Sequence, residues 1–220
     1  MKFEGALFDC DGVLVDSEPI TNGVLRDMLE ELGWTLSPDE CMRTFVGKTL
    51  KDEAALIEVR TGQRLTDAWL AQFRERRNAA LTLDLRVVEG AVDAVGHIYR
   101  MLAGRIACAS GADRIKVELQ LTKCGLMPYF QGRVFSGHET PRSKPAPDVY
   151  LAAAEAIGVA PTRCVVIEDT VTGVAAGIAA GATVFGYSPP GAGHDAPRAL
   201  RDAGASLIFT RMQELPALLG

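Results

Sequence analysis

Short apolar runs alternate with amphipathic helical patterns along most of the chain. The runs predict strands at 3–8, 105–109, 133–135, 164–167, 182–186 and 206–208. The periodicity between and after the later runs predicts helices at 88–102, 112–124, 148–157, 171–180, 196–203 and 212–219. The run at 165–167 is apolar at every position, which is typical of a parallel strand covered on both faces. The alternation therefore predicts an α/β fold built on a parallel sheet.

The pattern changes between position 16 and about position 86, where helix candidates follow one another without a convincing strand. They lie near 19–32, 39–45, 49–60 and 66–81. Ser37 precedes Pro38 and supplies a cap for the second of these helices, and Thr66 opens the fourth. We expect a helical insert at 16–87 within a sheet-bearing core formed by 1–15 and 88–220. The two crossings between these parts are expected to act as hinges.

Composition limits the class of protein. The chain has 220 residues, and its 48% hydrophobic content is enough to fill a globular core, which excludes disordered and fibrous classes. Its 23 basic and 28 acidic side chains give a net charge of −5 without a Lys/Arg run. Neither nucleic acid nor an anionic membrane is therefore expected as the main partner. Five cysteines without a C-x-x-C spacing predict neither a disulfide framework nor a zinc site.

The N-terminal residues and the longest uncharged stretch bear on location. Glu4 and Asp9 interrupt the first residues, so no apolar stretch of a signal peptide forms, and a cytoplasmic protein is expected. The stretch 170–193 carries no charge, but its glycines and two prolines make a membrane span improbable. A buried helix followed by a strand is the expected structure there.

Acidic side chains follow two of the predicted strands at the point where each strand ends. Asp9 and Asp11 follow the first strand, and residues two apart on an extended backbone project the same way. Glu168 and Asp169 end the strand at 164–167 in a similar manner. Carboxylates gathered at one rim repel by roughly 4 kcal/mol per pair at about 4 Å and an effective dielectric near 20. A cation relieves this repulsion, and oxygen-only ligands favour Mg²⁺ over zinc.

Other strand ends supply groups that suit a phosphoryl ligand. Ser110 offers a hydroxyl, and with Gly111 and Ala112 it offers backbone N–H groups at an expected helix start. Lys144, shortly after the run at 133–135, can balance negative charge. Acids, Mg²⁺, a hydroxyl donor and a lysine around one point predict a site for phosphoryl transfer, in which the charge of the transferring group must be neutralised.

These residues resemble the signatures of the haloacid dehalogenase-like hydrolases, in particular the subgroup that contains β-phosphoglucomutase and small sugar-phosphate phosphatases. The four signatures occur in order along nearly the whole chain: Asp9-Cys10-Asp11-Gly12-Val13-Leu14-Val15-Asp16-Ser17, then Ser110, then Lys144-Pro145-Ala146-Pro147, then Glu168-Asp169 with Gly173 and Gly177. The resemblance implies a Rossmann-like parallel-sheet core with a helical-bundle cap inserted after the first signature.

The resemblance also implies roles for the acids. Asp9 is expected to attack phosphorus and become a phosphoaspartate, and Asp11 to be the general acid and base. Asp9, the main-chain carbonyl of Asp11 and Asp169 are expected to bind Mg²⁺, with Glu168 either a direct ligand or a neighbour of the ligands. Lys144 is expected to steady both the nucleophile and the phosphate.

Further substrate-binding positions are expected at Ser110, Gly111 and Lys144, and in the insert. Lys48 and Lys51 lie where this subgroup places a substrate-facing cap loop, although a plain surface role explains them equally well. The three histidines, His97, His138 and His194, are scattered and are expected at the surface or in loops. Cys10 is expected to point away from the two acids beside it and to pack in the core.

The resulting hypothesis is a Mg²⁺-dependent phosphatase that hydrolyses a small phosphorylated metabolite, as a monomer or weak dimer. The stretches 134–137 and 142–145 are similar to those of phosphatases acting on sugar acids such as 6-phosphogluconate; phosphoglycolate and sugar monophosphates stay open. A β-phosphoglucomutase-type mutase is the alternative, weakened because Thr21 and Leu50 stand where mutases carry histidine and arginine. Asp11 argues against dehalogenation. A non-catalytic module that binds sugar phosphates is the alternative from another class.

Overall fold

The computed structural model describes residues 2–46, 50, 52–191 and 193–220. The chain divides into two compact units. One, which we call the sheet unit, comprises Met1–Asp16 and Arg86–Gly220, and the other, the helical unit, comprises Ser17–Leu85. The chain passes between them twice.

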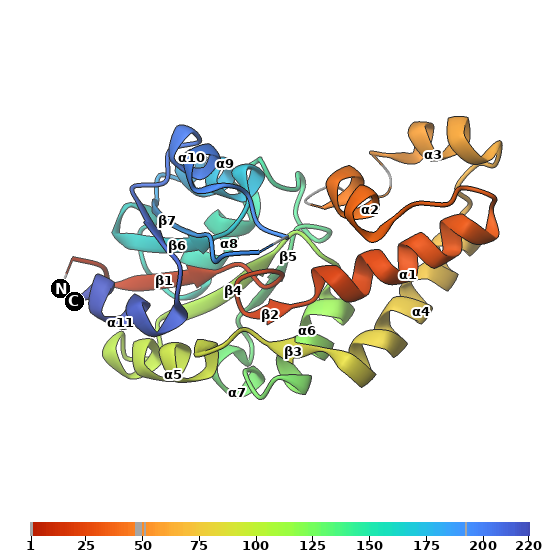
Figure 1. Ribbon diagram of the computed structural model, residues 1–220. Coiled ribbons are helices and arrows are strands. Elements are labelled where there is room, and N and C mark those ends of the chain that lie inside the picture. Colours follow the sequence, from red (N-terminus) through yellow and green to blue (C-terminus); the bar gives the residue numbers. More distant parts are fainter. Residues whose placement is uncertain (1, 47–49, 51, 192) are drawn as a thin grey trace. The chain divides into compact units, whose positions relative to one another are not determined.

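The sheet unit contains a six-stranded sheet with the order β5-β4-β1-β6-β7-β8 among the described residues (Figure 1). Every neighbouring pair in it is parallel. Its strands are β1 (Gly5–Phe8), β4 (Ile106–Ser110), β5 (Val134–Ser136), β6 (Cys164–Glu168), β7 (Thr183–Tyr187) and β8 (Leu207–Phe209). All six strands predicted from the apolar runs are confirmed, and so is the Rossmann-like α/β class. β1 and β6 lie at the centre of the sheet, where burial on both faces accounts for their continuous apolar sequence.

Helices cover both faces of this sheet (Figure 1). The helices of the sheet unit are α5 (Ala91–Met101), α6 (Arg114–Lys123), α7 (Met127–Phe130), α8 (Asp148–Ala156), α9 (Val171–Ala179), α10 (Pro197–Asp202) and α11 (Leu215–Leu219). Short 3₁₀ turns occur at Pro161–Arg163 and Met212–Glu214. Leu7 belongs to the core cluster on the face of α8 and α9, whereas the next residue, Phe8, contacts Phe130 of α7. This alternation is the ordinary consequence of the strand pleat.

The structure contains a second, two-stranded sheet that was not predicted. Val15–Asp16 (β2) and Arg86–Val87 (β3) pair antiparallel, with Val15 opposite Val87 and Asp16 opposite Arg86. These two strands flank the helical insert and were not among the strands predicted from the sequence. Each strand has only two residues, too few for an alternating pattern to be recognised in the sequence. The pairing ties together the two segments of the sheet unit that flank the insert.

The helical unit contains α1 (Glu18–Glu31), α2 (Pro38–Phe45), α3 (Ala54–Thr61) and α4 (Asp67–Asp84). Ser37 caps α2 as expected, because its side chain accepts from the backbone N–H of Glu40, whose own side chain bonds back to Ser37. The helix expected at 49–60 begins only at Ala54. Both tryptophans pack against the core of this unit. That core consists of Leu25, Met28, Leu29, Cys41, Phe45, Ile57 and Phe73.

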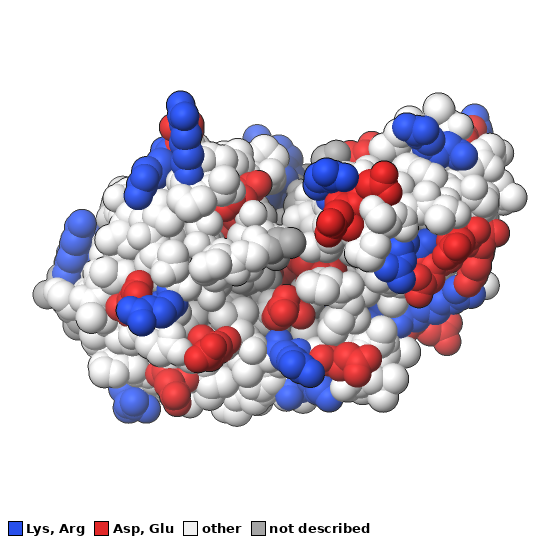
Figure 2. Space-filling model, viewed as in Figure 1, with Lys and Arg blue, Asp and Glu red and all other residues white. Residues whose placement is uncertain are grey.

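Charged side chains are mixed on the visible surface. On the face shown in Figure 2, acidic and basic residues are interspersed on both units. Within the described residues, no helix is both long and apolar enough to cross a bilayer.

Candidate active site

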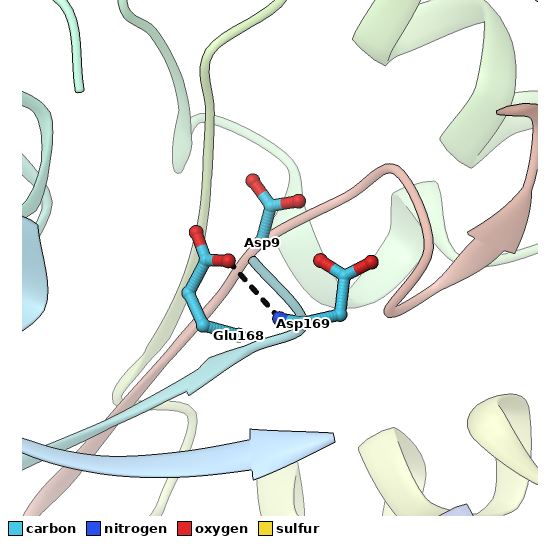
Figure 3. Close-up of side chains that lie close together, drawn as sticks. All are labelled: Asp9, Glu168 and Asp169. Carbon is cyan, nitrogen blue, oxygen red and sulfur yellow. Dashed lines mark hydrogen bonds between the residues drawn. The ribbon is translucent and has the colours of Figure 1, made fainter. Parts of the chain in front are cut away.

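Three buried carboxylates meet at the carboxyl ends of β1 and β6. Asp9 directly follows β1, while Glu168 ends β6 and Asp169 follows it (Figure 3). The pairing of Phe8 with Ile167 sets this register, and the backbone N–H of Asp9 donates to the carbonyl of Ile167 at 3.0 Å. One carboxylate oxygen from each of the three acids lies within 4.8 Å of the others. The expectation that the two acidic strand ends share one rim is therefore met by the geometry.

Lys144 joins two of these acids. Its ammonium lies 2.6 Å from Oδ1 of Asp9 and 2.7 Å from Oε1 of Glu168. It also donates to the hydroxyl of Tyr150 at 2.9 Å, and that hydroxyl donates to the same Glu168 oxygen at 2.7 Å. The Lys144 side chain is only 8% exposed, so its charge is compensated almost entirely by these groups rather than by water.

Burial and charge shift the proton affinities of this cluster. Burial raises the pKa of Asp9 well above its ordinary value, Lys144 opposes the rise, and Glu168, Asp169 and Asp11 add to it. Burial lowers the pKa of Lys144, but Asp9 and Glu168 outweigh that effect and raise it well above its ordinary value. Lys144 is thus held as a cation, while Asp9 carries a negative charge at a cost. A bound cation would remove that cost.

Glu168 is engaged on both of its oxygens. Oε1 accepts from Lys144 and Tyr150, and Oε2 accepts from the backbone N–H groups of Asp169 and Thr170 and from the Thr170 hydroxyl. These donors use the lone pairs that a carboxylate offers. Glu168 therefore orients Lys144 and the turn into α9. Gly173 makes room for it, because a Cβ at that position would lie 1.8 Å from Oε1.

Asp169 is enclosed by two neighbours. Gly12 has a φ of +80°, and a Cβ there would lie 2.0 Å from Oδ2 of Asp169, so the first loop passes against this carboxylate. Nδ1 of His194 lies 3.0 Å from the same oxygen, and the His194 side chain is 15% exposed. His194 lies in a loop, as expected, but its contact with Asp169 was not predicted. Its position in the loop after β7, which is next to β6 in the sheet, brings it to the acid.

Asp11 does not join the carboxylate cluster around Asp9 but is held by α6. Its Oδ1 lies 2.8 Å from Nζ of Lys116 and accepts from Nε2 of Gln120 at 2.8 Å. Cys10, between the two acids, is fully buried in the core as expected, and its thiol donates to Oε1 of Gln120 at 3.4 Å.

Ser110 and Gly111 lie at the end of β4, beside β1. The Ser110 side chain is buried, and its hydroxyl accepts from the backbone N–H of Ala112 at 3.1 Å. The helix expected to start at Ala112 begins instead at Arg114, because Asp113 caps it by accepting from the backbone N–H of Lys116. Ser110 is therefore the last residue of β4, and Gly111 and Ala112 lie between the strand and the helix rather than at the helix start.

The structure brings only some of the predicted site residues into one cluster. The structure brings together Asp9, Lys144, Glu168 and Asp169, and it places Asp11 and Ser110 at the ends of the same or the neighbouring strand. Lys48 and Lys51 lie outside the described residues.

Comparisons with known proteins decide the family. The model of the haloacid dehalogenase-like hydrolases matches residues 3–181. The chain belongs to this family. This hydrolase is 32% identical to 6-phosphogluconate phosphatase of Escherichia coli (strain K12), over 84% of this chain and 82% of that protein. It is 33% identical to fructose-1-phosphate phosphatase YqaB of the same strain, over 82% of this chain and 94% of that protein.

A solved structure agrees with these relatives. The haloacid dehalogenase family hydrolase from Deinococcus radiodurans R1, crystallised with bound phosphate and sodium, is 37% identical and superimposes with a TM-score of 0.81. The alignment covers 99% of this chain and 95% of that one. The expected enzyme class, a phosphatase, is confirmed by the family and by the named activities of the relatives.

The donor set of this hydrolase fits a hard divalent cation. The cluster of Asp9, Glu168 and Asp169 offers only carboxylate oxygens, which suit Mg²⁺ rather than a softer metal. Burial, with a smaller contribution from the neighbouring acids, raises the pKa of Asp9, and a positive ion at the cluster would favour the charged form of these carboxylates.

Several residues of the site were missed in the sequence. Four residues contact an acid of the site but belong to none of the signatures quoted above: Tyr150, Lys116, Gln120 and His194. The spacing of Lys116 and Gln120, four apart, could have shown that they share a face of one helix. Nothing in the sequence alone indicates which acid that face meets.

Proposed function

We propose that this hydrolase is a Mg²⁺-dependent phosphatase that cleaves a small sugar phosphate or sugar-acid phosphate through a phosphoaspartate at Asp9. The observation that carries the proposal is the contact of the Lys144 ammonium with Asp9, inside a ring of buried carboxylates. Lys144 holds the Asp9 carboxylate in one orientation, and the remaining acids supply the negative charge that recruits a cation.

The first half of the reaction forms one bond and breaks another. An oxygen of Asp9 attacks phosphorus, and the bond from phosphorus to the substrate oxygen breaks as the acyl phosphate forms. Asp11 gives its proton to the departing oxygen, so that the sugar leaves as an alcohol. In the second half Asp11 takes a proton from water, whose oxygen attacks phosphorus and releases inorganic phosphate and Asp9.

The cation and the phosphate are assigned to neighbouring groups. Asp9, Asp169 and the main-chain carbonyl of Asp11 would hold Mg²⁺, which supplies neutralisation of charge on the transferring phosphoryl group. Glu168, already engaged on both oxygens, would support Lys144 and Asp169 rather than bind the ion. Ser110 and the backbone of Gly111 would hold phosphoryl oxygens at the end of β4. Lys48 and Lys51 stay proposed substrate contacts.

The substrate class rests on the relatives. Two of them are named as phosphatases of 6-phosphogluconate and of fructose 1-phosphate, which are both small phosphorylated compounds. The similarity of the stretches 134–137 and 142–145 to sugar-acid phosphatases favours 6-phosphogluconate among the candidates. We propose that this reaction takes place in the cytoplasm, where such metabolites are found.

The test is a phosphate-release screen over a broad panel of phosphorylated metabolites, with and without a chelator, with Asp9→Asn as the blank. We expect release from sugar phosphates that is lost in the blank and with the chelator, and acid-quenched phosphate on Asp9 in peptide mapping. Faster conversion of β-glucose 1-phosphate to glucose 6-phosphate than to free phosphate, with a trace of bisphosphate, would establish the mutase instead. Binding without any turnover would establish the non-catalytic module.

A further inference from the structure

Helix α6 contacts the Asp11 carboxylate through two of its side chains. Lys116 and Gln120 both reach Oδ1 of Asp11, each at 2.8 Å. Lys116 is 5% exposed and Gln120 is fully buried, while the Asp11 side chain is 16% exposed. A buried ammonium and a buried amide thus meet one carboxylate oxygen, which is an arrangement with an energetic cost unless both donors are satisfied.

The sequence of α6 explains why both donors face the same way. Residues four apart lie above one another on a helix, so positions 116 and 120 share a face. Asp113 fixes the start of the helix by accepting from the backbone N–H of Lys116 at 3.0 Å. The cap therefore sets the backbone position from which Lys116 reaches Asp11.

The amide of Gln120 has a defined orientation. Its Oε1 accepts from the Cys10 thiol at 3.4 Å, which leaves Nε2 as the donor to Asp11. Cys10 and Asp11 are adjacent in the chain, so the first loop of the sheet unit is bound to α6 at two consecutive residues. Rotation of the Asp11 side chain would break two hydrogen bonds inside a nearly closed environment.

We propose that Lys116 and Gln120 are positioning residues for the proton transfers at Asp11. The proposal rests on the proposed function, in which Asp11 is the acid and base. With Oδ1 held by α6, Oδ2 is the oxygen that gives its proton to the departing substrate oxygen and later takes one from water. Neither Lys116 nor Gln120 contacts the reacting atoms; each acts by fixing the plane of the Asp11 carboxylate.

The experiment compares two synthetic monoesters in the first turnover. Benzyl phosphate has an alkoxide leaving group that needs a proton, whereas 4-nitrophenyl phosphate loses a phenolate that needs none. We expect Lys116→Met to slow phosphoenzyme formation from benzyl phosphate about 10- to 100-fold, part of the effect of losing general acid catalysis, and from 4-nitrophenyl phosphate less than about threefold. Gln120→Met should change the two rates in the same unequal way, by less.

Matched variants keep the test decisive. Lys123→Met makes the same substitution at an exposed position of α6 and should leave both rates unchanged. Because removal of one partner from a buried ion pair destabilises a protein, circular dichroism is recorded for each variant, and Gln120→Met carries the test if Lys116→Met does not fold. Equal slowing of both esters, or no slowing of either, would overturn the proposal. Asp11→Asn tests the proposed acid role of Asp11 separately from the positioning roles of Lys116 and Gln120. If this variant slows phosphoenzyme formation equally from both esters, Asp11 is not the general acid.

Discussion

The hydroxyl of Tyr150 connects the Lys144 ammonium to the Glu168 carboxylate. It accepts from Lys144 in a partly buried contact and donates to Glu168 in a buried one. Burial raises the pKa of Tyr150 well above its ordinary value, with Glu168 adding to the shift, so the hydroxyl keeps its proton for donation. Without it, Glu168 and Lys144 would each lose a polar partner in a place that water does not reach.

Tyr150→Phe therefore tests how much one hydroxyl contributes. We expect it to lower the free energy of unfolding by about 1.5–3 kcal/mol, the usual contribution of a hydrogen bond to a charged group. Tyr99→Phe is the matched control, since the Tyr99 ring belongs to α5 and packs against Tyr129. Urea denaturation of both variants measures the difference. Equal effects of the two substitutions would show that the Tyr150 hydroxyl is not structurally important.

The ionised carboxylate of Asp9, unlike the hydroxyl of Tyr150, is expected to lower the free energy of unfolding. Because its pKa is raised in the folded chain, its ionisation opposes folding at every pH above its ordinary pKa. The stability present when Asp9 is protonated is lost as the pH rises through the raised value. Asp9→Asn keeps the side chain neutral at every pH, so the stability of this variant relative to the unmodified metal-free chain should be greater at pH 8 than at pH 5.

Thermal unfolding with a chelator at these two pH values measures this effect. Asp202→Asn, at an exposed position at the end of α10, is the control and should leave the midpoint unchanged at both. A stabilisation by Asp9→Asn that is equal at the two pH values would mean that the charge of Asp9 is not its source. Loss of activity with gain of stability is the usual sign of a strained functional residue.

At the scale of elements, α9 shows how close packing builds the site. Gly173 and Gly177 lie four apart on one face of α9 and are both buried. The first accommodates the Glu168 carboxylate, and the second lets the helix approach β6 and β7. A Cβ at position 177 would lie 2.7 Å from Cγ2 of Val184 and 3.2 Å from Cγ1 of Val166. Helix α9, which starts just after Glu168 and Asp169, thus packs closely against β6, the strand that ends at Glu168.

Gly177→Ala should therefore destabilise the chain although alanine favours helix. Overpacking costs about 1–3 kcal/mol, whereas the helical preference for alanine returns only about 0.5–1 kcal/mol. Gly23→Ala in α1 is the matched control, because a Cβ there meets nothing within 4 Å and only the gain remains. Urea denaturation should show opposite signs for the two variants. Stabilisation by both would mean that Val184 and Val166 move aside at little cost.

The elements also show which parts of the site the sequence could predict. Asp9, Glu168 and Asp169 were predictable because each follows a continuous apolar run, and parallel strands end at the same edge. The start of α6 was not, because Asp113 caps better than Ser110 can from three residues earlier. The contacts of Lys116 and Gln120 with Asp11 link positions 105 or more residues apart and depend on which way one helix face turns. Hydrophobic periodicity carries no information on that.

At the scale of the whole molecule, a bound cation is a stabilising ligand. Any ion that binds the folded chain and not the unfolded one adds RT ln(1 + [L]/Kd) to the free energy of unfolding. The buried acids Asp9 and Asp169 belong to the sheet unit, whereas Trp34 and Trp69 both belong to the helical unit. Tryptophan fluorescence therefore reports on the unit without the acids, and circular dichroism is the probe that also follows the other.

Mg²⁺ should raise the unfolding midpoint measured by circular dichroism. At a free concentration of about 100 times the Kd the gain is about 2.7 kcal/mol, and a chelator should reverse it. Asp169→Asn should abolish the gain, because it replaces a buried carboxylate of the proposed cation site with a neutral amide. Asp84→Asn, at the exposed end of α4, removes a charge from the helical unit and should retain the whole gain. If Mg²⁺ stabilised Asp169→Asn as much as the unmodified chain, the ion would be bound elsewhere. Since this readout does not depend on turnover, it tests the cation site separately from the substrate and from the acid at position 11.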